Sequence, residues 1–511
     1  MTGADQGINP LTGQSVGRPV PHTDAAGVTA ATAAARAAAP EWAALAPTRR
    51  AEILDAVAAA LEAARAELVP LADAETALGE ARLAGEVTRT RVQWAMFADA
   101  LREGSHLDVV IDRADPAALP APRPDLRRMM VPLGPVAVYA ASNFPFAFSV
   151  PGGDTVSALA AGCPVVVKAH PGHPGLSARV GRIVADALRD AGAPDGVFAV
   201  VHGFEAGRAL VTDPNITAAA FTGSLAGGRA LFDLAAGRPD PIPFYGELGS
   251  LNPTVVTAAA VAARGDELAA GFVGSMTLGA GQFCTKPGLL FLPAGHGLDD
   301  RLADAVGTAE VGPLLDERIA DGFRRGTDAL AKVPGVRPLA TGAAASGDGW
   351  HVPVRLFAVS AADLAAHADE ALHECFGPAG LVVEYADDAQ LLAALSAVPG
   401  ALTATLHAEP DDALGPVLLD FMAARAGRVI WGGWPTGVAV TWAMQHGGPW
   451  PATTAPLHTS VGVTAVRRFL RPVVYQGVPD ALLPPALRDD NPWGLPRRVN
   501  GSLLKSGENP I

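Results

Sequence analysis

The sequence has few cysteines, and this scarcity excludes two classes of protein. Only three occur in 511 residues: Cys163, Cys284 and Cys375. The number is odd and no C-x-x-C pair is present, so neither a disulfide framework nor a cysteine-rich zinc site is expected, and no metal is predicted. A free cysteine is most often a small buried hydrophobic residue. Each cysteine is therefore treated as a packing residue unless its surroundings indicate chemistry.

Basic residues and long apolar runs are also scarce. Lys and Arg number 38 against 52 Asp and Glu, which gives a formal net charge of -14. This balance argues against nucleic acid as the main partner, because phosphate binding needs clustered basic residues. No apolar run reaches the roughly 18 residues that a membrane span needs. The N-terminal stretch MTGADQGINPLTG is polar and lacks a signal-peptide pattern, so a cytoplasmic location is expected.

The chain is long enough for more than one domain and has the composition of a globular protein. Apolar residues make up 49% of it and charged residues 18%. Apolar residues at three- and four-residue spacing predict helices over residues 24–104, with Asp24 as a candidate N-cap. A strand is expected at 106–112. The proline-rich segment 113–128 is interpreted as a linker or an extended arm.

From residue 135 onward, short apolar runs alternate with helical segments. VAVYA, PVVVK, GVFAVVHG and TAAAFTG each precede a helix-like stretch, which is typical of a parallel sheet covered by helices. The same alternation resumes near residue 250 and continues to about 440. Ligands bind at the carboxyl ends of such strands. The candidates at those ends are residues 141–143, 168–170 and 222–224.

A G-x-G-x-x-G dinucleotide fingerprint is missing, but another glycine-rich junction is present. FTGSLAGG, residues 221–228, lies where a strand meets a helix. Glycines there allow a phosphate or a flat ring to approach the backbone, and the helix start offers free N–H groups. An ordinary glycine-rich turn explains the segment equally well. Lys168 ends another strand and suits a ribose hydroxyl or a phosphate, although most such lysines lie at the surface.

Three residues have the chemistry of a nucleophile, a base and an oxyanion donor. Cys284, in GAGQFCTKPG, has small neighbours, and an accessible cysteine near a base is nucleophilic. Glu247 lies between glycines in GELGS; burial there would raise its pKa, as suits a general base. Asn143, at a strand end, can direct its amide at an oxyanion. The structural alternatives are a buried filler, a salt-bridged glutamate and an Asx turn.

The segment HECFGP and the histidines complete the list of candidates. Glu374 lies in a Gly/Pro turn, where a carboxylate can accept hydrogen bonds from ribose hydroxyls, whereas Cys375 and Cys163 are interpreted as packing residues. Cysteine hydrolases that depend on histidine are the rival chemistry. Twelve histidines are present, and none lies in a local signature of those hydrolases.

Six short motifs occur together in one order: SNFPF, VVVK, FTGS, ELGSLNP, GQFCT and ECFGP. In order and spacing they resemble the aldehyde dehydrogenase superfamily, and the resemblance extends over nearly the whole chain. ETALGEARLAGEVTRTRVQWAMFA, VKAHPGHPG, PTGVAVTWAMQHGGPWPATT and the ending DNPWGLPRRVNGSL are most similar to one branch. That branch contains ketoglutarate semialdehyde (2,5-dioxopentanoate) dehydrogenases that use NADP and related fatty aldehyde dehydrogenases.

The resemblance implies a role for each motif. Cys284 would attack the aldehyde carbon, Asn143 and the Cys284 N–H would hold the oxyanion, and Glu247 would activate water to release the acid. The implied NAD(P)-binding residues are Lys168, His170, Arg208, Phe221, Gly223, Ser224, Gly228, Leu248, Glu374 and Phe376. The residues expected to line the substrate site are Phe144, Phe146 and Trp450.

The implied fold is α/β, with two doubly wound parallel-sheet domains and a small β arm for oligomerisation. The expected limits are 1–113 and 135–248 for the cofactor-binding domain, 249–445 for the catalytic domain, 114–134 and 464–490 for the arm, and 446–463 and 491–511 for a return segment and tail. A homodimer or homotetramer is expected, because edge strands of the arm can pair between subunits.

Three departures from the family pattern bear on ligand choice. Members that prefer NAD often carry a glutamate three residues after the lysine, where this chain has Pro171. Its absence favours NADP, with NAD as the alternative, and Arg208 and His170 are candidate phosphate partners. Ser250 replaces a glycine, a small change. HGGPWPATT replaces the frequent PFGGxxxSG, which predicts a different substrate entrance.

Oxidation of 2,5-dioxopentanoate to its carboxylate is the leading prediction. A medium- or long-chain aliphatic aldehyde dehydrogenase is the alternative, and a CoA-acylating relative is weaker because such relatives generally lack a glutamate like Glu247. The intact Cys, Glu and Asn disfavour a catalytically idle relative. Arg89, Arg91 and Arg102, on a predicted helix, are candidates for binding a substrate carboxylate, but a surface position is expected for each.

Overall fold

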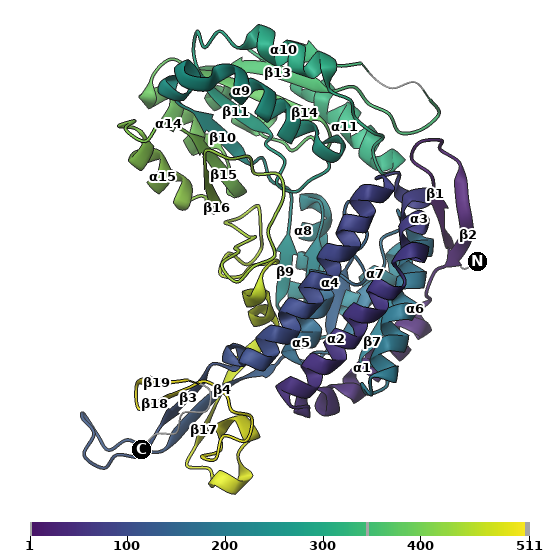
Figure 1. The fold of residues 1–511 in the computed structure, drawn as a ribbon, viewed down its shortest axis with the longest axis vertical. Helices are drawn as coiled ribbons and strands as arrows, with labels where there is room; N and C mark the ends of the chain where they lie inside the picture. The colour runs from purple at the N-terminus through teal and green to yellow at the C-terminus, as the bar shows by residue number, and fades with distance from the viewer. Residues whose placement is uncertain (1–2, 344–346, 506–511) are drawn as a thin grey trace.

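The N-terminal part of the chain is a β-hairpin followed by four helices. A computed structural model describes residues 3–343 and 347–505 (Figure 1). Three stretches lie outside the described residues: 1–2 at the start of the predicted cofactor domain, 344–346 in the predicted catalytic domain, and 506–511 at the end of the predicted tail. The elements are β1 (Ala4–Ile8), β2 (Ser15–Pro21), α1 (Ala25–Ala44), α2 (Pro47–Ala63), α3 (Arg65–Thr76) and α4 (Glu80–Glu103).

The helical prediction for residues 24–104 is confirmed, and its boundary signals act as expected. Asp24 caps α1 by accepting a hydrogen bond from the Gly27 N–H at 2.8 Å. Pro47 begins α2, where a missing N–H removes no helical bond. None of the helices among the described residues is long and apolar enough to cross a membrane.

The first parallel sheet has the strand order β7-β6-β5-β8-β9. Its strands are β5 (Val136–Tyr139), β6 (Val165–Lys168), β7 (Phe198–Val201), β8 (Ala218–Thr222) and β9 (Phe244–Glu247), and its helices are α5 (Gly153–Ala161), α6 (Pro174–Asp190), α7 (Phe204–Thr212) and α8 (Leu225–Ala236). Successive residues of β5 point to opposite faces of the sheet and pack into two different hydrophobic cores. Val136 and Val138 pack with α2, α4, α5 and α6, whereas Ala137 and Tyr139 pack with α1, α7 and α8. A strand buried on both faces explains the unbroken apolar sequence.

The register of this sheet aligns the predicted site residues along one edge. Lys168 lies opposite Tyr139, which lies opposite Phe221 on its other side. Thr222 lies opposite Glu247, the last residue of β9. Carboxyl ends of parallel strands meet at one edge, so three motifs far apart in sequence are neighbours there.

The second sheet has the order β12-β13-β14-β11-β10-β15-β16, and every neighbouring pair is parallel except β12 with β13. Its strands are β10 (Pro253–Val256), β11 (Leu289–Pro293), β12 (Arg337–Thr341), β13 (Arg355–Ser360), β14 (Ala379–Tyr385), β15 (Ala401–His407) and β16 (Ala426–Trp431). Its helices are α9 (Ala258–Thr277), α10 (Asp299–Thr308), α11 (Glu317–Leu330), α12 (Ala361–Ala366), α13 (Ala368–Ala371), α14 (Asp388–Ala397) and α15 (Gly415–Ala423). This sheet and its helices form a lobe separate from the first sheet (Figure 1).

A third sheet, β17-β4-β3-β18-β19, projects away from both lobes (Figure 1). Its strands are β3 (Val109–Asp112), β4 (Leu126–Pro132), β17 (Leu470–Gln476), β18 (Arg497–Val499) and β19 (Ser502–Leu504). The predicted arm supplies β4 and β17. The sheet also takes in β3, from the predicted cofactor domain, and β18 and β19, from the predicted tail, because β3 pairs with both β4 and β18. The α/β prediction is confirmed, while the domain limits stay a prediction.

Candidate active site

Cys284 lies just after α9, behind a tight turn formed by Leu278–Gly281. Gly279, Ala280 and Gly281 all have positive φ, at 59°, 57° and 68°. A Cβ on Gly281 would come within 2.2 Å of the Gly377 carbonyl oxygen, so only glycine fits there. Ala280 is an L-residue in the left-handed region, a conformation that costs about 1–2 kcal/mol. The small residues before Cys284 are therefore explained by backbone packing.

Hydrogen bonds from two side chains, Asn252 and Lys286, hold the backbone around Cys284. Asn252, in the ELGSLNP motif, donates from Nδ2 to the carbonyls of Cys284 at 2.8 Å and Lys286 at 2.9 Å. The Lys286 Nζ donates to the carbonyls of Cys375 and Ala379, at 3.0 and 2.8 Å. The lysine amine is thus used in anchoring the turn and is directed away from the thiol.

The Cys284 thiol lies in a cluster with two buried residues, Glu247 and His446. Its Sγ is 3.4 Å from His446 Nε2, and the same nitrogen is 2.8 Å from Glu247 Oε1. Ser460 donates its hydroxyl to the other oxygen of Glu247. The Sγ, Nε2 and carboxylate atoms all lie within 4.8 Å of one another, so the three groups form one cluster around the thiol.

Burial and neighbouring groups set the charge state of this cluster. Burial alone would raise the pKa of Glu247, but His446, Ser460 and the Cys284 thiol together hold it below its ordinary value. The expectation of a raised pKa for Glu247 is therefore wrong. Burial, followed by the negative charge of Glu247, raises the pKa of the Cys284 thiol well above its ordinary value. The resting pair is an ionised carboxylate beside a protonated thiol.

The hydrogen-bond network also fixes where His446 carries its proton. Because Glu247 is ionised and accepts from Nε2, that nitrogen bears the hydrogen and faces both the carboxylate and the sulfur. The other nitrogen, Nδ1, is buried and has no partner among the described residues. The His446 backbone N–H donates to Thr459 Oγ1 at 2.8 Å, which fixes the backbone that carries the ring.

Asn143 lies in the loop after β5, close to the Cys284 turn. Its Nδ2 donates to the Gln282 carbonyl at 2.9 Å, two residues before Cys284. Arg82 donates to the Asn143 carbonyl at 2.7 Å. The structure therefore brings Asn143, Glu247 and Cys284 together from three separate motifs.

Glu374 lies beside Gly249, in the segment that follows β9. A Cβ on Gly249 would come within 2.3 Å of Glu374 Oε2, so the GELGS motif needs a glycine there. Burial raises the pKa of Glu374 to about 7, against the opposing charge of Lys286. Phe376, two residues on, is half-buried.

Lys168 and His170 lie at the carboxyl end of β6. Burial lowers the pKa of the Lys168 amine to about 8, and its stem packs against Gly207 at the start of α7. His170 accepts from the Gly172 N–H at 3.0 Å, and burial lowers its pKa well below the ordinary value. A neutral imidazole used in its own turn is a poor phosphate partner, so His170 is a weaker candidate than Lys168.

The glycines of FTGSLAGG pack against neighbouring side chains. A Cβ on Gly223 would come within 2.7 Å of the Phe221 ring, and one on Gly228 within 2.1 Å of Leu248 Cδ2. Ser224 caps α8 by accepting from the Gly227 N–H at 3.2 Å. The junction is exposed at Ser224, so the start of α8 presents its N–H groups outward.

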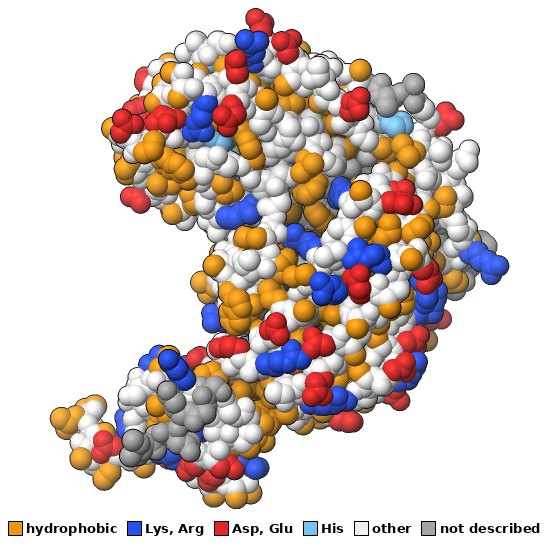
Figure 2. Space-filling view, in the orientation of Figure 1, with side chains coloured by type: hydrophobic (Ala, Val, Ile, Leu, Met, Phe, Trp, Pro, Cys, Tyr) orange, Lys and Arg blue, Asp and Glu red, His pale blue; other side chains and the backbone are white. Residues whose placement is uncertain are grey.

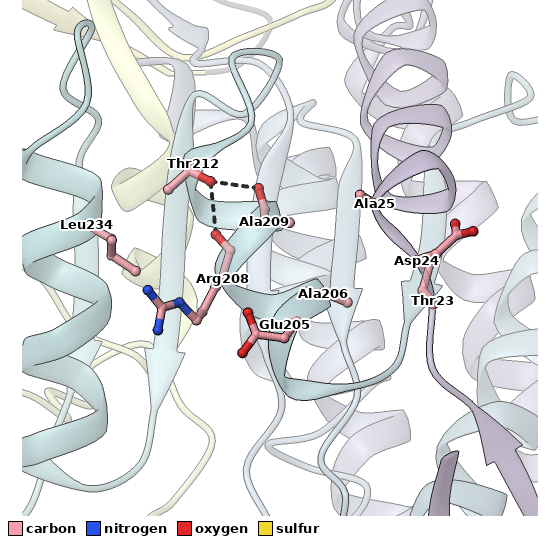
Figure 3. A pocket seen from close by; sticks show the side chains of 9 residues that line it. All are labelled: Thr23, Asp24, Ala25, Glu205, Ala206, Arg208, Ala209, Thr212 and Leu234. Atoms are coloured by element: carbon pink, nitrogen blue, oxygen red, sulfur yellow. Dashed lines mark hydrogen bonds between the residues drawn. The ribbon is translucent and has the colours of Figure 1, made fainter. Parts of the chain in front are cut away.

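A cavity of about 420 Å³ lies between α7, the start of α1 and α8 (Figure 3). Arg208 and Glu205 line it from α7, and Leu234 lines it from α8. In Figure 3 the side chains of Arg208 and Leu234 lie on facing elements of this cavity. Arg208 is next in sequence to Gly207, against which Lys168 packs.

The three predicted substrate residues have different surroundings. Phe144 belongs to an aromatic row, with its ring 5.1 Å from Phe283 and 5.4 Å from Phe148. Phe146 is 1% exposed and packs in the core between α2, α4 and the first sheet, so the structure gives it a packing role. Trp450 is half exposed and lies 5.9 Å from the guanidinium of Arg229 on α8.

A profile of the aldehyde dehydrogenase family matches residues 4–449. The chain belongs to the aldehyde dehydrogenase family. It is 49% identical over 465 residues to alpha-ketoglutaric semialdehyde dehydrogenase 2 of Azospirillum brasilense, a match that covers 88% of each chain. It is 43% identical to alpha-ketoglutaric semialdehyde dehydrogenase of Acinetobacter baylyi, over 90% of this chain and 88% of that one.

The fold agrees with this membership. The structure of 1-pyrroline-5-carboxylate dehydrogenase from Thermus with bound NAD superposes with a TM-score of 0.78, at 23% identity, over 93% of this chain and 90% of that one. The protein is thus an aldehyde-oxidising oxidoreductase of a family that uses NAD(P). The predicted family, enzyme class and fold are confirmed.

In this aldehyde dehydrogenase, His446 is the site residue that sequence reasoning missed. It lies in HGGPWPATT, the segment singled out only as a departure from the family pattern. A histidine directly before two glycines was the available signal. Its contact with a cysteine 162 residues away leaves no trace in local spacing.

Proposed function

We propose that this aldehyde dehydrogenase oxidises 2,5-dioxopentanoate, the semialdehyde of ketoglutarate, to the carboxylate with NADP as the preferred cofactor. The observation that carries the reaction is the buried contact of Cys284 with His446 and Glu247. The substrate follows from two relatives, 49% and 43% identical, whose names specify that semialdehyde. The aliphatic alternative is not favoured.

In the proposed reaction, Cys284 attacks the aldehyde carbon and forms a thiohemiacetal. The thiol proton passes to Glu247, the ionised carboxylate beside it, while His446 Nε2–H faces the sulfur and stabilises the thiolate. The Asn143 amide and the Cys284 backbone N–H hold the oxyanion. The Asn143 amide donates one of its two hydrogens to the Gln282 carbonyl. Its second hydrogen therefore points away from that carbonyl and is free for the oxyanion. Glu247 must first release the thiol proton to solvent, and as a carboxylate it then accepts a proton from the water that hydrolyses the thioester.

The described residues fit an NAD(P) molecule. The cavity between α7 and α8 is lined by Arg208, and the buried amine of Lys168 packs on the same helix. A bound NAD(P) would supply the hydride acceptor that the oxidation of the thiohemiacetal requires. We propose that Lys168 and Arg208 hold the adenosine end, that Phe221, Gly223, Ser224, Gly228 and Leu248 form the wall at α8, and that Glu374 and Phe376 position the nicotinamide ribose and ring.

The low pKa of Lys168 predicts a pH-dependent affinity for NADP. The free amine is charged below about pH 8 and loses its charge above it. A bound 2′-phosphate favours the charged form, so the Kd for NADP is expected to be flat below pH 8 and to rise up to about tenfold per pH unit above it. Fluorescence titration of NADPH between about pH 7 and pH 9.5 measures this. Lys168→Met should weaken binding and flatten the profile; an unchanged slope in that variant contradicts the proposal.

Replacement of His446 is predicted to slow catalysis by raising the pKa of the thiol further. In His446→Asn the donor to the thiolate is lost and Glu247 is less well held, so kcat should fall about 10²-fold. The pH at which iodoacetamide alkylates Cys284 at half its maximal rate should move upward. A variant with reduced kcat but an unshifted alkylation profile would show that His446 acts in some other way.

The substrate assignment is tested by steady-state kinetics with matched aldehydes. We expect kcat/KM for 2,5-dioxopentanoate to exceed that for hexanal and glycolaldehyde by at least about tenfold, because binding a charged group adds specificity. Each aldehyde is measured with NADP and with NAD. A higher kcat/KM for hexanal would overturn the substrate assignment.

Product analysis in the presence of CoA tests the CoA-acylating alternative, because it separates a free acid from a CoA thioester. The presence of Glu247 predicts the free acid.

The arm supports the proposal of a homodimer or homotetramer. Apolar side chains gather at its far end (Figure 2), and Leu119 in the proline-rich segment is 92% exposed. β17 is an edge strand of the arm sheet, and Val474 on it is also exposed. Such an edge can pair with a second copy of the chain. Light scattering should therefore give two or four times the mass of one chain. The cytoplasmic location expected from the sequence also stays a prediction.

A further inference from the structure

Arg89 on α4 holds a charged group in the protein interior without a carboxylate partner. Its Nη1 donates to the Val438 carbonyl at 2.7 Å. Its Nε and Nη2 are buried and have no partner among the described residues, and it forms no ion pair there. Burial of a guanidinium without a carboxylate is costly, so an arginine kept in this state suggests that an anion binds to it.

The two free nitrogens are the ones that suit a carboxylate. Nε–H and one Nη2–H of a guanidinium point in parallel and can bind both oxygens of a carboxylate at once. The third group, Nη1, is already fixed to the backbone. The arginine is therefore anchored at one end, and its bidentate edge is left unused.

Arg89 lies near the catalytic cluster, on the far side of the Phe148 ring. Its guanidinium is 5.6 Å from the centre of the Phe148 ring, and that ring is 6.4 Å from the ring of His446. His446 in turn contacts the Cys284 sulfur. Burial and Glu247 raise the pKa of the Cys284 thiol overall, and the positive charge of Arg89 opposes this rise, as expected for two groups within electrostatic reach of each other.

The nearest acidic residue on the same helix does not neutralise Arg89. Glu86, one turn earlier, accepts the N–H groups of Phe146 and Ala147 with one oxygen, at 2.9 and 3.0 Å. Its other oxygen has no partner among the described residues, and no ion pair joins it to Arg89 there. Glu86 is thus committed to the backbone of the FPFAF segment, although its charge partly offsets that of the arginine.

A second arginine approaches from the opposite lobe. Arg428 on β16 donates to the carbonyls of Pro435 and Gly437, and its Nε is buried without a partner among the described residues. Arg89 and Arg428 therefore both donate hydrogen bonds to backbone carbonyls of the same loop, residues 435–438. Arg428 also lies within electrostatic reach of Cys284.

The other arginines of α4 differ from Arg89. Arg91 lies 3.7 Å from Glu62, and Arg102 pairs with Asp99 at 3.0 Å, both at the surface. Arg82 also has a buried nitrogen, Nη1, without a partner among the described residues. It lies over Phe144 and Phe283 and donates to the Asn143 carbonyl, so it supports the loop that holds Asn143. The expected surface position is correct for Arg91 and Arg102 and wrong for Arg89.

We propose that Arg89 binds the carboxylate of an anionic aldehyde substrate through its Nε and Nη2 groups, with Arg428 adding positive charge, and so selects semialdehyde acids over neutral aldehydes. The proposal rests on the proposed function and assigns its specificity to a residue. A five-carbon keto acid has its aldehyde and carboxylate at opposite ends, so it can span from the Cys284 sulfur to a cation beyond the aromatic row. Arg89 is a specificity-determining residue and takes no part in the chemical steps.

The test compares Arg89→Met with the wild type on two five-carbon aldehydes, 2,5-dioxopentanoate and pentanal. Methionine keeps the apolar stem against Phe148 and removes the charge. We expect kcat/KM for 2,5-dioxopentanoate to fall about 100-fold or more, mainly through KM, because two charge-assisted hydrogen bonds are lost. The value for pentanal should stay within about threefold. Arg89→Lys should lie between, since it keeps charge without the bidentate edge.

Arg91→Met is the matched control, because it removes a charge from the same helix at the surface. It should leave both aldehydes unaffected. An equal fall for both aldehydes in Arg89→Met, or an unchanged preference for the acid, would overturn the role of Arg89. A wild-type enzyme that itself favours pentanal would instead overturn the substrate assignment, so the two failures are distinguishable. As a binding check, 2-oxoglutarate should inhibit pentanal oxidation at least tenfold more weakly in Arg89→Met.

Discussion

Replacing Cys284 with alanine should abolish aldehyde oxidation while NADP still binds. The sulfur is the only nucleophile in the buried cluster with His446 and Glu247, and neither of these can form the thioester in its place. Loss of a covalent nucleophile typically costs about 10⁴-fold or more in kcat. The measurement is steady-state turnover with 2,5-dioxopentanoate, together with fluorescence titration of NADPH, whose Kd should change by no more than about twofold.

Cys163→Ala provides the matched control for this loss. Cys163 is fully buried at the start of β6, and its thiol contacts the Phe469 carbonyl at 3.4 Å. Its removal should lower stability by about 1 kcal/mol and leave kcat near the wild-type value. Near-normal turnover by Cys284→Ala would refute Cys284 as the nucleophile. A variant that loses cofactor binding as well would indicate a folding defect.

The parts of the site carried by local sequence were predictable. Cys284 and Asn143 lie in glycine- or proline-marked turns, and Lys168 and Glu247 each end a short apolar strand. Strand–helix alternation implies a parallel sheet, and a parallel sheet places such strand ends along one edge. The register of β6, β5, β8 and β9 shows this directly.

The contacts made over long sequence separations were not predictable from the residues around them. His446 and Ser460 reach Glu247 across 199 and 213 residues. Burial alone predicts a raised pKa for a glutamate, and the structure reverses that direction because His446, Ser460 and the Cys284 thiol converge on the carboxylate. The same limit applies to Arg89, since a helix sequence does not show which lobe will cover its face.

Aromatic residues were predicted unevenly for a related reason. FPFAF supplies Phe144 and Phe148 to the row beside Cys284, but Phe146 between them enters the core. The segment forms a turn after β5, so its side chains do not share one face. Composition marks such a segment as apolar without stating which ring packs and which lines a site.

Glu247→Gln should separate the two proton transfers assigned to this carboxylate. Glutamine keeps an oxygen for His446 but cannot accept a proton, so water is no longer activated and the thioester is expected to accumulate. Steady-state kcat should fall about 10²- to 10⁴-fold. Rapid mixing should show a burst of NADPH of about one per active site, slower than in the wild type because the thiol has also lost its proton acceptor.

Hydroxylamine distinguishes between these two roles because it attacks the thioester without a base. If Glu247 acts mainly in hydrolysis, added hydroxylamine should restore most of the turnover of Glu247→Gln. If there is no burst of NADPH and no rescue by hydroxylamine, the carboxylate is needed chiefly to deprotonate Cys284. That result would contradict its role in hydrolysis of the thioester. Glu75→Gln is the matched control: this buried carboxylate accepts the N–H groups of Gly175 and Leu176, so its loss should lower stability and leave the kinetics unchanged.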